Sequence, residues 1–341
     1  MTTALVDVPL SYAESVLVEL GALGYSIEYL FNKAGLHVPA TAYQTMDLQL
    51  PASEFIKLYS YCYRLLEAET SRRPDGNHLD EQAFEMMCYC LICCENLEGV
   101  IDRVSVFNRV LGPLGSHYEL HKTDQAARFT LDLRRRTRNN ASLLVCLATM
   151  NVLHQLFAWL IGKPLRLHEV SVRSPSPGRP NHMAESLGAP LKYNQPEDSF
   201  SFSPDYLEHR IVKGHNELQA VIHYFSFDIA YSGSSEGTLT ERINMMILSC
   251  LQRKSPIPSS EAIAQLYGMS ASSLRRRLRI EGTHFTKIRA ACLMDYAEYL
   301  LNETRFKIDD IAAQLGFSDD RAFRRAFKQW RGLSPSGFRR Q

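Results

Sequence analysis

The sequence predicts an α+β N-terminal domain, followed by an all-α C-terminal domain in which a long helix joins two helix-turn-helix units. Three observations support this division. Formal charge is distributed unevenly, the apolar spacing becomes purely helical after residue 238, and the C-terminal part contains an internal repeat. We therefore expect an N-terminal domain at residues 1–230, a linker ("YSGSSEG") at 231–237 and a C-terminal domain at 238–341.

The charge distribution separates the two domains. The whole chain of 341 residues has a formal net charge of only +1. Residues 238–341 contain 18 lysines and arginines against 10 acidic residues, a net of +8, and the remaining 20 basic and 27 acidic residues have a net of −7. This asymmetry indicates a basic C-terminal domain with a polyanionic partner.

The N-terminal domain mixes helical and strand patterns. Helical spacing predicts two short helices in 12–36 and further helices at 51–67, 79–94, 96–112, 143–162 and 207–230. Alternating apolar and polar residues in "HYELHKTDQAARFTLDL" predict a β-hairpin with its turn at Thr123–Gln125. Strands are also expected in "LRLHEVSV" and "DSFSF", with a short helix between them.

Two segments of this domain allow more than one interpretation. The apolar stretch Leu143–Gly162 is interrupted by Asn151, His154 and Gln155, which favours a buried core helix or a dimer face over a membrane span. The basic run "RRRTRNN" after the hairpin is typical of a solvated loop rather than a binding site.

The sequence favours no enzymatic chemistry. The cluster "CYCLICC" lacks a second CxxC or a His pair at zinc spacing, so we interpret its cysteines as buried apolar residues. P-loop, GxGxxG and HExxH motifs are absent from the sequence. We therefore expect no enzyme, no metal and no cofactor. The first residues show no export signal, which predicts a cytoplasmic location with reduced thiols.

The repeat in the C-terminal domain predicts two helix-turn-helix units. "SSEAIAQLYGMSASSLRRRLRIEG" and "KIDDIAAQLGFSDDRAFRRAFKQWRG" each contain an acidic start, Ile-Ala, Leu, Gly and Ser, followed by two apolar residues four positions apart. The glycine permits the turn, the serine caps the second helix, and the apolar pair is buried. These positions are Gly268 and Gly316, Ser270 and Ser318, Leu274 with Leu278, and Phe323 with Phe327.

The outward faces of the second helices are basic. They present Arg275, Arg276 and Arg279 in the first unit and Arg321, Arg324, Arg325 and Lys328 in the second. Guanidinium groups bind guanine edges and phosphate oxygens. A helix from His284 to Leu301 would span roughly 27 Å, comparable with the length of one DNA turn, about 34 Å. We therefore expect one chain to contact two successive major grooves of double-stranded DNA.

The segment "IAAQLGFSDDRAFRRAFKQWRGLSP" resembles the signature of the AraC/XylS family of bacterial transcription regulators, and the resemblance extends over Thr240–Arg340. It implies base-facing positions at Ser272, Arg275 and Arg276 in the first unit and at Asp320, Arg321 and Arg324 in the second. For Arg325 it leaves open whether the side chain contacts DNA or braces the fold.

The N-terminal part resembles a subgroup with an arabinose-binding-like domain through "PASEFIKLY" and "PEDSFSFSPDYLE". The resemblance implies a cytoplasmic, nucleoid-associated regulator of metabolic, quorum-sensing or virulence genes, which forms a homodimer through this domain. A small-molecule effector and RNA polymerase are further candidate partners, and a membrane is not. Two alternatives stay open: a ligand-free dimerisation module, or a carrier or enzyme with a DNA-binding appendage. The residues indicate no effector site.

Overall fold

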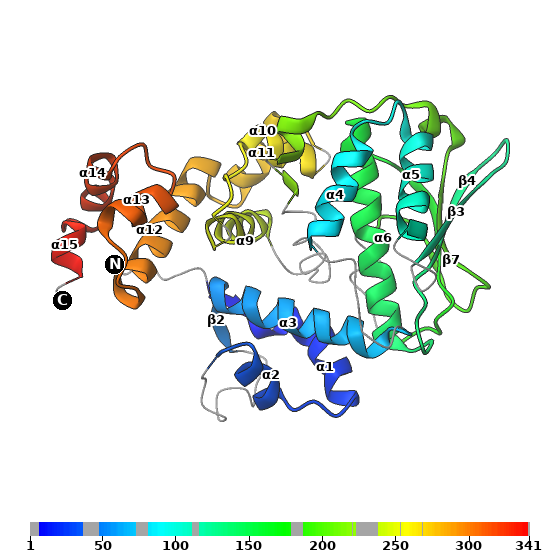
Figure 1. Cartoon of the computed structure of the whole chain (residues 1–341), viewed down its shortest axis with the longest axis horizontal. Coiled ribbons are helices and arrows are strands. Elements are labelled where there is room, and N and C mark those ends of the chain that lie inside the picture. The colour runs from blue at the N-terminus through cyan, green and yellow to red at the C-terminus, as the bar shows by residue number, and fades with distance from the viewer. Residues whose placement is uncertain are drawn as a thin grey trace.

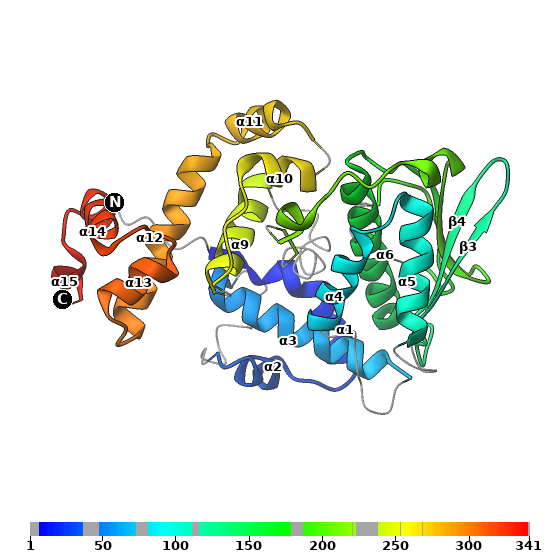
Figure 2. The ribbon, with the colours of Figure 1, turned by 45° about the horizontal axis from the view of Figure 1, so that its top comes forward.

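The computed structural model describes residues 7–36, 48–72, 81–110, 116–178, 187–219, 221–222, 238–252, 254–267 and 269–339. Figures 1 and 2 show a larger part that combines helices with a sheet and a smaller, purely helical part that extends from it. The predicted fold class is confirmed. The expected linker at 231–237 and the expected short helix before the last strand fall on 223–237 and 179–186, outside the described residues.

The N-terminal part begins with helices. They are α1 (Glu14–Ala22), α2 (Ile27–Lys33), α3 (Ala52–Thr70), α4 (Glu81–Leu91), α5 (Leu97–Val110) and α6 (Asn140–Ile161). Strand β1 (Asp7–Pro9) pairs antiparallel with β2 (Gln49–Pro51), and both strands contact α3. All the helices expected here before residue 163 are present.

A five-stranded sheet has the order β3-β4-β7-β5-β6 and lies against α5 and α6 (Figure 1). Its strands are β3 (His117–Lys122), β4 (Ala127–Asp132), β5 (Leu167–Ser171), β6 (Leu191–Lys192) and β7 (Asp198–Phe202). The predicted hairpin is confirmed, because β3 and β4 pair from His117–Asp132 to Lys122–Ala127. The central strand β7 is buried along its whole length.

The helix expected at 207–230 is partly wrong. The 3₁₀ turn η3 (Pro204–Glu208) ends before a non-helical segment at 209–214, and helix resumes only at residue 215. The backbone amides of this segment bond elsewhere: Ile211 N donates to Glu95 O at 3.0 Å and Val212 N donates to Leu160 O at 3.0 Å. These partners hold the segment extended over the end of α6.

Helix α6 forms the centre of the domain. Asn139 caps it by accepting from Ser142 N at 3.1 Å, and Gly162 ends it in the left-handed conformation. Phe157 of α6 meets Phe129 of β4 edge to face, with ring centroids 5.5 Å apart. The helix is long and apolar enough to cross a membrane, yet 78% of its apolar window is buried inside the protein. Its surface is already covered, so the dimer-face interpretation of α6 is wrong and the core-helix interpretation is confirmed.

Two further expectations for this domain need correction. The basic run is not uniformly solvated, because the Arg135 side chain is only 13% exposed and donates to Glu67 O at 3.1 Å and Thr70 Oγ1 at 3.2 Å. The cysteine cluster is only half buried. Cys88 and Cys94 lie in the core, whereas Cys90 and Cys93 are exposed, because the four residues point to different sides of α4 and the turn after it.

Everything described after residue 238 is helical apart from short connections, as predicted. The helices are α9 (Leu239–Gln252), α10 (Ser260–Leu266), α11 (Ala271–Ile280), α12 (Phe285–Glu303), α13 (Ile308–Gln314), α14 (Asp320–Arg331) and α15 (Pro335–Phe338). Helix α9 packs on both α12 and α3, and α10 contacts α6. The first helix-turn-helix unit is therefore in contact with the N-terminal part, while α13–α15 extend away from it (Figure 2).

Candidate nucleic-acid interface

The first unit consists of α10 and α11. Ser259 caps α10 by accepting from Ala262 N at 3.2 Å. Ser270 caps α11 by accepting from Ser273 N at 3.2 Å, as the repeat predicted. Leu274 and Leu278 lie on the inner face of α11 and are buried, which confirms the apolar pair. The expected turn glycine, Gly268, lies outside the described residues.

The outer face of α11 is a free basic surface. The exposed residues on this helix include all the sequence-predicted ones: Ser272, Arg275, Arg276 and Arg279, together with Arg277. None of these arginines forms an ion pair with another residue in the described part of the chain. The Ser272 hydroxyl lies 2.8 Å from Ser270 Oγ and so belongs to the cap as well. The helix thus offers four guanidinium groups that form no ion pair with any residue that the structure describes.

The second unit consists of α13 and α14. Gly316, at φ 76°, makes the turn that the repeat predicted. The predicted cap at Ser318 is wrong, since α14 is capped by Asp319, whose carboxylate accepts from Ala322 N at 2.7 Å. Phe323 and Phe327 are buried, and Phe327 meets Phe338 of α15 edge to face at 5.4 Å. The predicted apolar pair is confirmed here too.

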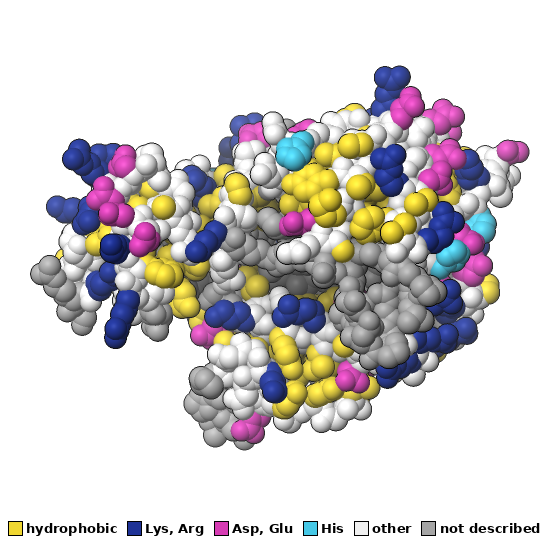
Figure 3. All heavy atoms as spheres, in the orientation of Figure 1, with side chains coloured by type: hydrophobic (Ala, Val, Ile, Leu, Met, Phe, Trp, Pro, Cys, Tyr) yellow, Lys and Arg dark blue, Asp and Glu magenta, His cyan; other side chains and the backbone are white. Residues whose placement is uncertain are grey.

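The outer face of α14 is basic but partly paired. Arg321, Arg325 and Lys328 are exposed. Arg324 is half-buried: its Nε donates to Asp320 Oδ2 at 3.0 Å and its Nη1 donates to Ser336 Oγ at 3.4 Å. Two residues predicted to face bases are therefore each other's partners in the protein without DNA. Figure 3 shows lysine and arginine side chains over the region of α13–α15.

A bidentate ion pair fixes the second unit to the connecting helix. Arg331, in the last turn of α14, donates through Nε to Glu298 Oε1 and through Nη2 to Glu298 Oε2, the latter at 2.6 Å. Arg339 Nε also donates to the Leu301 carbonyl at 3.2 Å. Sequence reasoning missed both contacts, because nothing in the spacing pairs residues 33 and 38 positions apart.

Two pKa shifts are found in and between the two units. The Ala322 backbone amide, helped by Ser318 and Arg325, holds the pKa of the Asp319 carboxyl below its usual value. Burial raises the pKa of the Cys292 thiol inside α12, so this cysteine is no thiolate nucleophile. No group of three or more metal-binding side chains occurs among the described residues.

Comparison with known proteins agrees with this arrangement. Residues 24–211 match the family described as the arabinose-binding domain of AraC transcription regulators, at their N-terminus, and residues 263–341 match a helix-turn-helix domain family. The chain belongs to the AraC family of transcription regulators. As a member of the AraC family with this helix-turn-helix architecture, it is a DNA-binding transcription regulator.

The AraC-family relatives include proteins of similar length. The chain is 27% identical to the ornithine utilization regulator of Pseudomonas aeruginosa over 333 residues, which cover 97% of this chain and 96% of that protein. It is 24% identical to the regulator VqsM of the same organism over 281 residues, covering 77% and 82%. A crystal structure of the regulator CdpR of Pseudomonas aeruginosa has a TM-score of 0.33 and 18% identity and covers 93% of this chain and 99% of that one.

Proposed function

We propose that the chain reads two successive major grooves of a promoter, with α11 in one groove and α14 in the other. The observation that supports this proposal is the exposure of arginines on α11, which form no ion pair with described residues, together with the basic outer face of α14. Each of these helices is the second helix of a helix-turn-helix unit. The proposed groove contacts are Ser272, Arg275, Arg276, Arg279, Asp320, Arg321, Arg324, Arg325 and Lys328. Helix α12, with 19 residues, spans roughly 28 Å at 1.5 Å per residue and separates the two units.

We also propose where the protein acts, how it assembles and which partners it has. The chain acts in the cytoplasm, without an enzymatic activity of its own, and forms a homodimer through the N-terminal part. That part responds to a small-molecule effector, and the DNA-bound protein acts on RNA polymerase. Support comes from the contact between the N-terminal part and α9–α10, through which a change in one could reach the other.

In vitro selection from random DNA duplexes with the full-length protein tests the groove assignment. We expect an enriched site with two half-sites about 10–11 base pairs apart. Arg276→Ala should relax base preference in one half-site only and Arg324→Ala in the other, and each should lower affinity by about 1–3 kcal/mol. Arg277→Ala, on the same helix as Arg276 but outside the predicted contacts, is the matched control and should retain both base preferences.

Three outcomes would contradict the proposal. The first is enrichment of a single half-site, which would leave one unit without a groove. The second is a uniform loss of affinity across all sequences in both variants, which would make Arg276 and Arg324 phosphate contacts. The third is loss of base preference in Arg277→Ala, because that would place a different face of α11 against the DNA.

A further inference from the structure

The N-terminal part contains a cavity of about 130 Å³ whose wall is rich in arginine. It lies where the end of α3, the connection from β4 to α6, the first turns of α6 and the ends of β5 and β7 meet. Five arginines line it against two aspartates, a net formal charge of +3. This is the opposite sign to residues 1–237, which have a net charge of −7.

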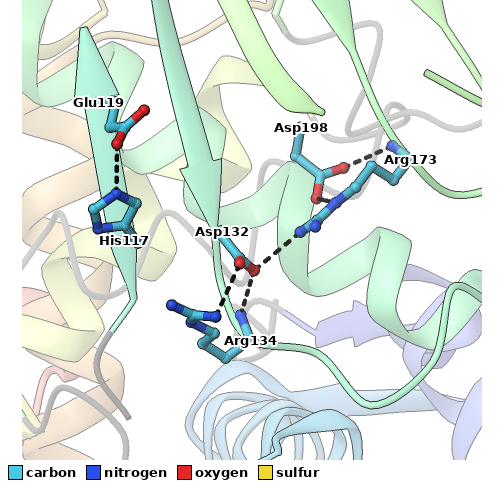
Figure 4. A network of polar contacts seen from close by, with 6 residues as sticks. All are labelled: His117, Glu119, Asp132, Arg134, Arg173 and Asp198. Atoms are coloured by element: carbon cyan, nitrogen blue, oxygen red, sulfur yellow. Dashed lines mark hydrogen bonds and ion pairs between the residues drawn. The ribbon is translucent and has the colours of Figure 1, made fainter. Parts of the chain in front are cut away.

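Both aspartates of the wall form ion pairs with Arg173. Figure 4 shows the Arg173 guanidinium between Asp132 of β4 and Asp198 of β7. Arg173 Nε donates to Asp198 Oδ2 at 2.8 Å, and Arg173 Nη2 donates to Asp132 Oδ1 at 3.1 Å. Asp198 also accepts from the Arg173 backbone amide at 2.7 Å. Arg173 and the two carboxylates therefore form a fixed floor, and neither aspartate is left to neutralise the other arginines.

Three of the four remaining arginines form no ion pair with the residues that the structure describes. The side chains of Arg72, Arg136 and Arg138 are exposed at the rim and form no ion pair with any described residue. Arg135 is held by Glu67 and Thr70, yet its Nε is buried without a hydrogen-bond partner among the described residues. Figure 3 shows lysine and arginine side chains gathered near this end of α3 and α6.

We propose that this cavity binds a small metabolite through an oxyanion group, a carboxylate or a phosphate. Guanidinium forks match the geometry of both groups, and the beginning of the 22-residue helix α6 adds a favourable dipole. A cavity of this volume is close to one of about 150 Å³ that holds benzene, so the ligand has on the order of six to ten non-hydrogen atoms. The arginine-rich wall disfavours a neutral sugar.

The position of the cavity suits an effector site. The effector role rests on the proposed regulatory function, but the binding of a ligand in the cavity does not depend on it. Ser142 and Cys146, near the beginning of α6, line the cavity. At the other end of α6, Leu160 O accepts from Val212 N, and the neighbouring Lys213 donates to Gln265 of α10 at 2.5 Å. One buried helix thus connects the cavity with the first helix-turn-helix unit.

Thermal melting and calorimetric titration of the full-length protein without DNA, at constant ionic strength, test the proposal. The probes are succinate, inorganic phosphate and L-arabinose. We expect succinate or phosphate at a hundred times its dissociation constant to raise the Tm of the full-length protein by about 4 °C. In the double variant Arg136→Gln/Arg138→Gln, the dissociation constant should rise at least tenfold, and the Tm shift at the same ligand concentration should shrink. Arg128→Gln, an exposed arginine of β4 outside the cavity wall, is the matched control and should retain it.

The outcomes separate cleanly. A response to succinate alone identifies a carboxylate ligand, and a response to phosphate alone identifies a phosphate ester. No response to either anion, or equal responses in the double variant and in Arg128→Gln, would overturn the proposal. A response to arabinose that survives in the double variant would overturn it as well. Because DNA is absent from the measurement, failure here leaves the groove assignment untouched, and failure of the DNA selection leaves this result untouched.

Discussion

The Lys213 ammonium donates to the side-chain amide oxygen of Gln265 across 2.5 Å, from the segment after η3 to helix α10. Lys213 is only 8% exposed, lies 5.5 Å from the centre of the Trp159 ring and also donates to Glu217 at 3.2 Å. A buried ammonium needs such partners because desolvation without them is costly. The hydrogen bond from Lys213 to Gln265 of α10 therefore joins the N-terminal part to the first helix-turn-helix unit.

A double-mutant cycle should detect this coupling. We expect Lys213→Met and Gln265→Leu to destabilise the full chain less in combination than the sum of the single effects, with an interaction free energy of about 0.5–2 kcal/mol. Urea unfolding of the four proteins provides the measurement. Lys163→Met, at an exposed position, is the control and should change stability by less than about 0.5 kcal/mol. Additive effects of the two substitutions would show that Lys213 and Gln265 are energetically independent.

The second prediction concerns the link between α14 and α12. Arg331→Met removes both donors to Glu298, a pair whose side chains are 20% and 18% exposed. We expect a loss of about 1–3 kcal/mol in the free energy of unfolding, between the values for exposed and fully buried pairs. Arg325→Met, on the exposed face of the same helix, should cost less than about 0.5 kcal/mol. An equal loss in both variants would assign the effect to the loss of a positive charge from α14 rather than to the ion pair with Glu298.

The C-terminal fold could be predicted from the sequence because its signals are local. Apolar pairs four residues apart, such as Leu274 with Leu278, dictate which face of a helix is buried, and this depends only on helical geometry. The cap of α14 could not be resolved, because Ser318 and Asp319 are adjacent and both residue types cap helices. Small differences in backbone conformation at the turn decide between them.

The arginine cavity could not be predicted because it is built from distant segments. Arg72 follows α3, Arg135 follows β4 and Arg173 follows β5. In the sequence, Arg135 belongs to a basic run that is typical of a solvated loop. Only the packing of α3 against α6 and the antiparallel register of β5 with β7 bring these residues together. Such juxtapositions depend on tertiary contacts and leave no periodic trace in the chain.

The third prediction tests the core of the second unit. Phe327 is fully buried and contacts both Phe323 and Phe338, with ring centroids 5.7 and 5.4 Å away. Phe327→Ala should therefore cost about 3–5 kcal/mol. Amide hydrogen exchange should show loss of protection in α13–α15 while the sheet keeps its protection. Gln329→Ala, exposed on the same helix, is the control. Unchanged protection in α13–α15 would mean that the second unit does not depend on this aromatic contact.

The last prediction follows from the floor of the cavity. Burial opposes ionisation of Asp132, but hydrogen bonds from the Arg134 backbone amide and from Arg173 outweigh it and hold the pKa of this carboxyl below its usual value of 3.8. A carboxyl whose pKa is lower in the folded than in the unfolded state stabilises the fold above the unfolded pKa. That contribution is lost as the pH falls through the lower folded value.

We therefore expect Asp132→Asn to be less stable than the unmodified protein at neutral pH, with the difference shrinking as the pH falls below about 3.8. Urea unfolding between about pH 3 and pH 7 measures both curves. Asp124→Asn, in the exposed hairpin turn, is the control for loss of a surface carboxylate. A difference between the Asp132→Asn and unmodified proteins that stays constant through this range would contradict the prediction. It would mean that the aspartate contributes through shape and neutral hydrogen bonding rather than through its charge beside Arg173.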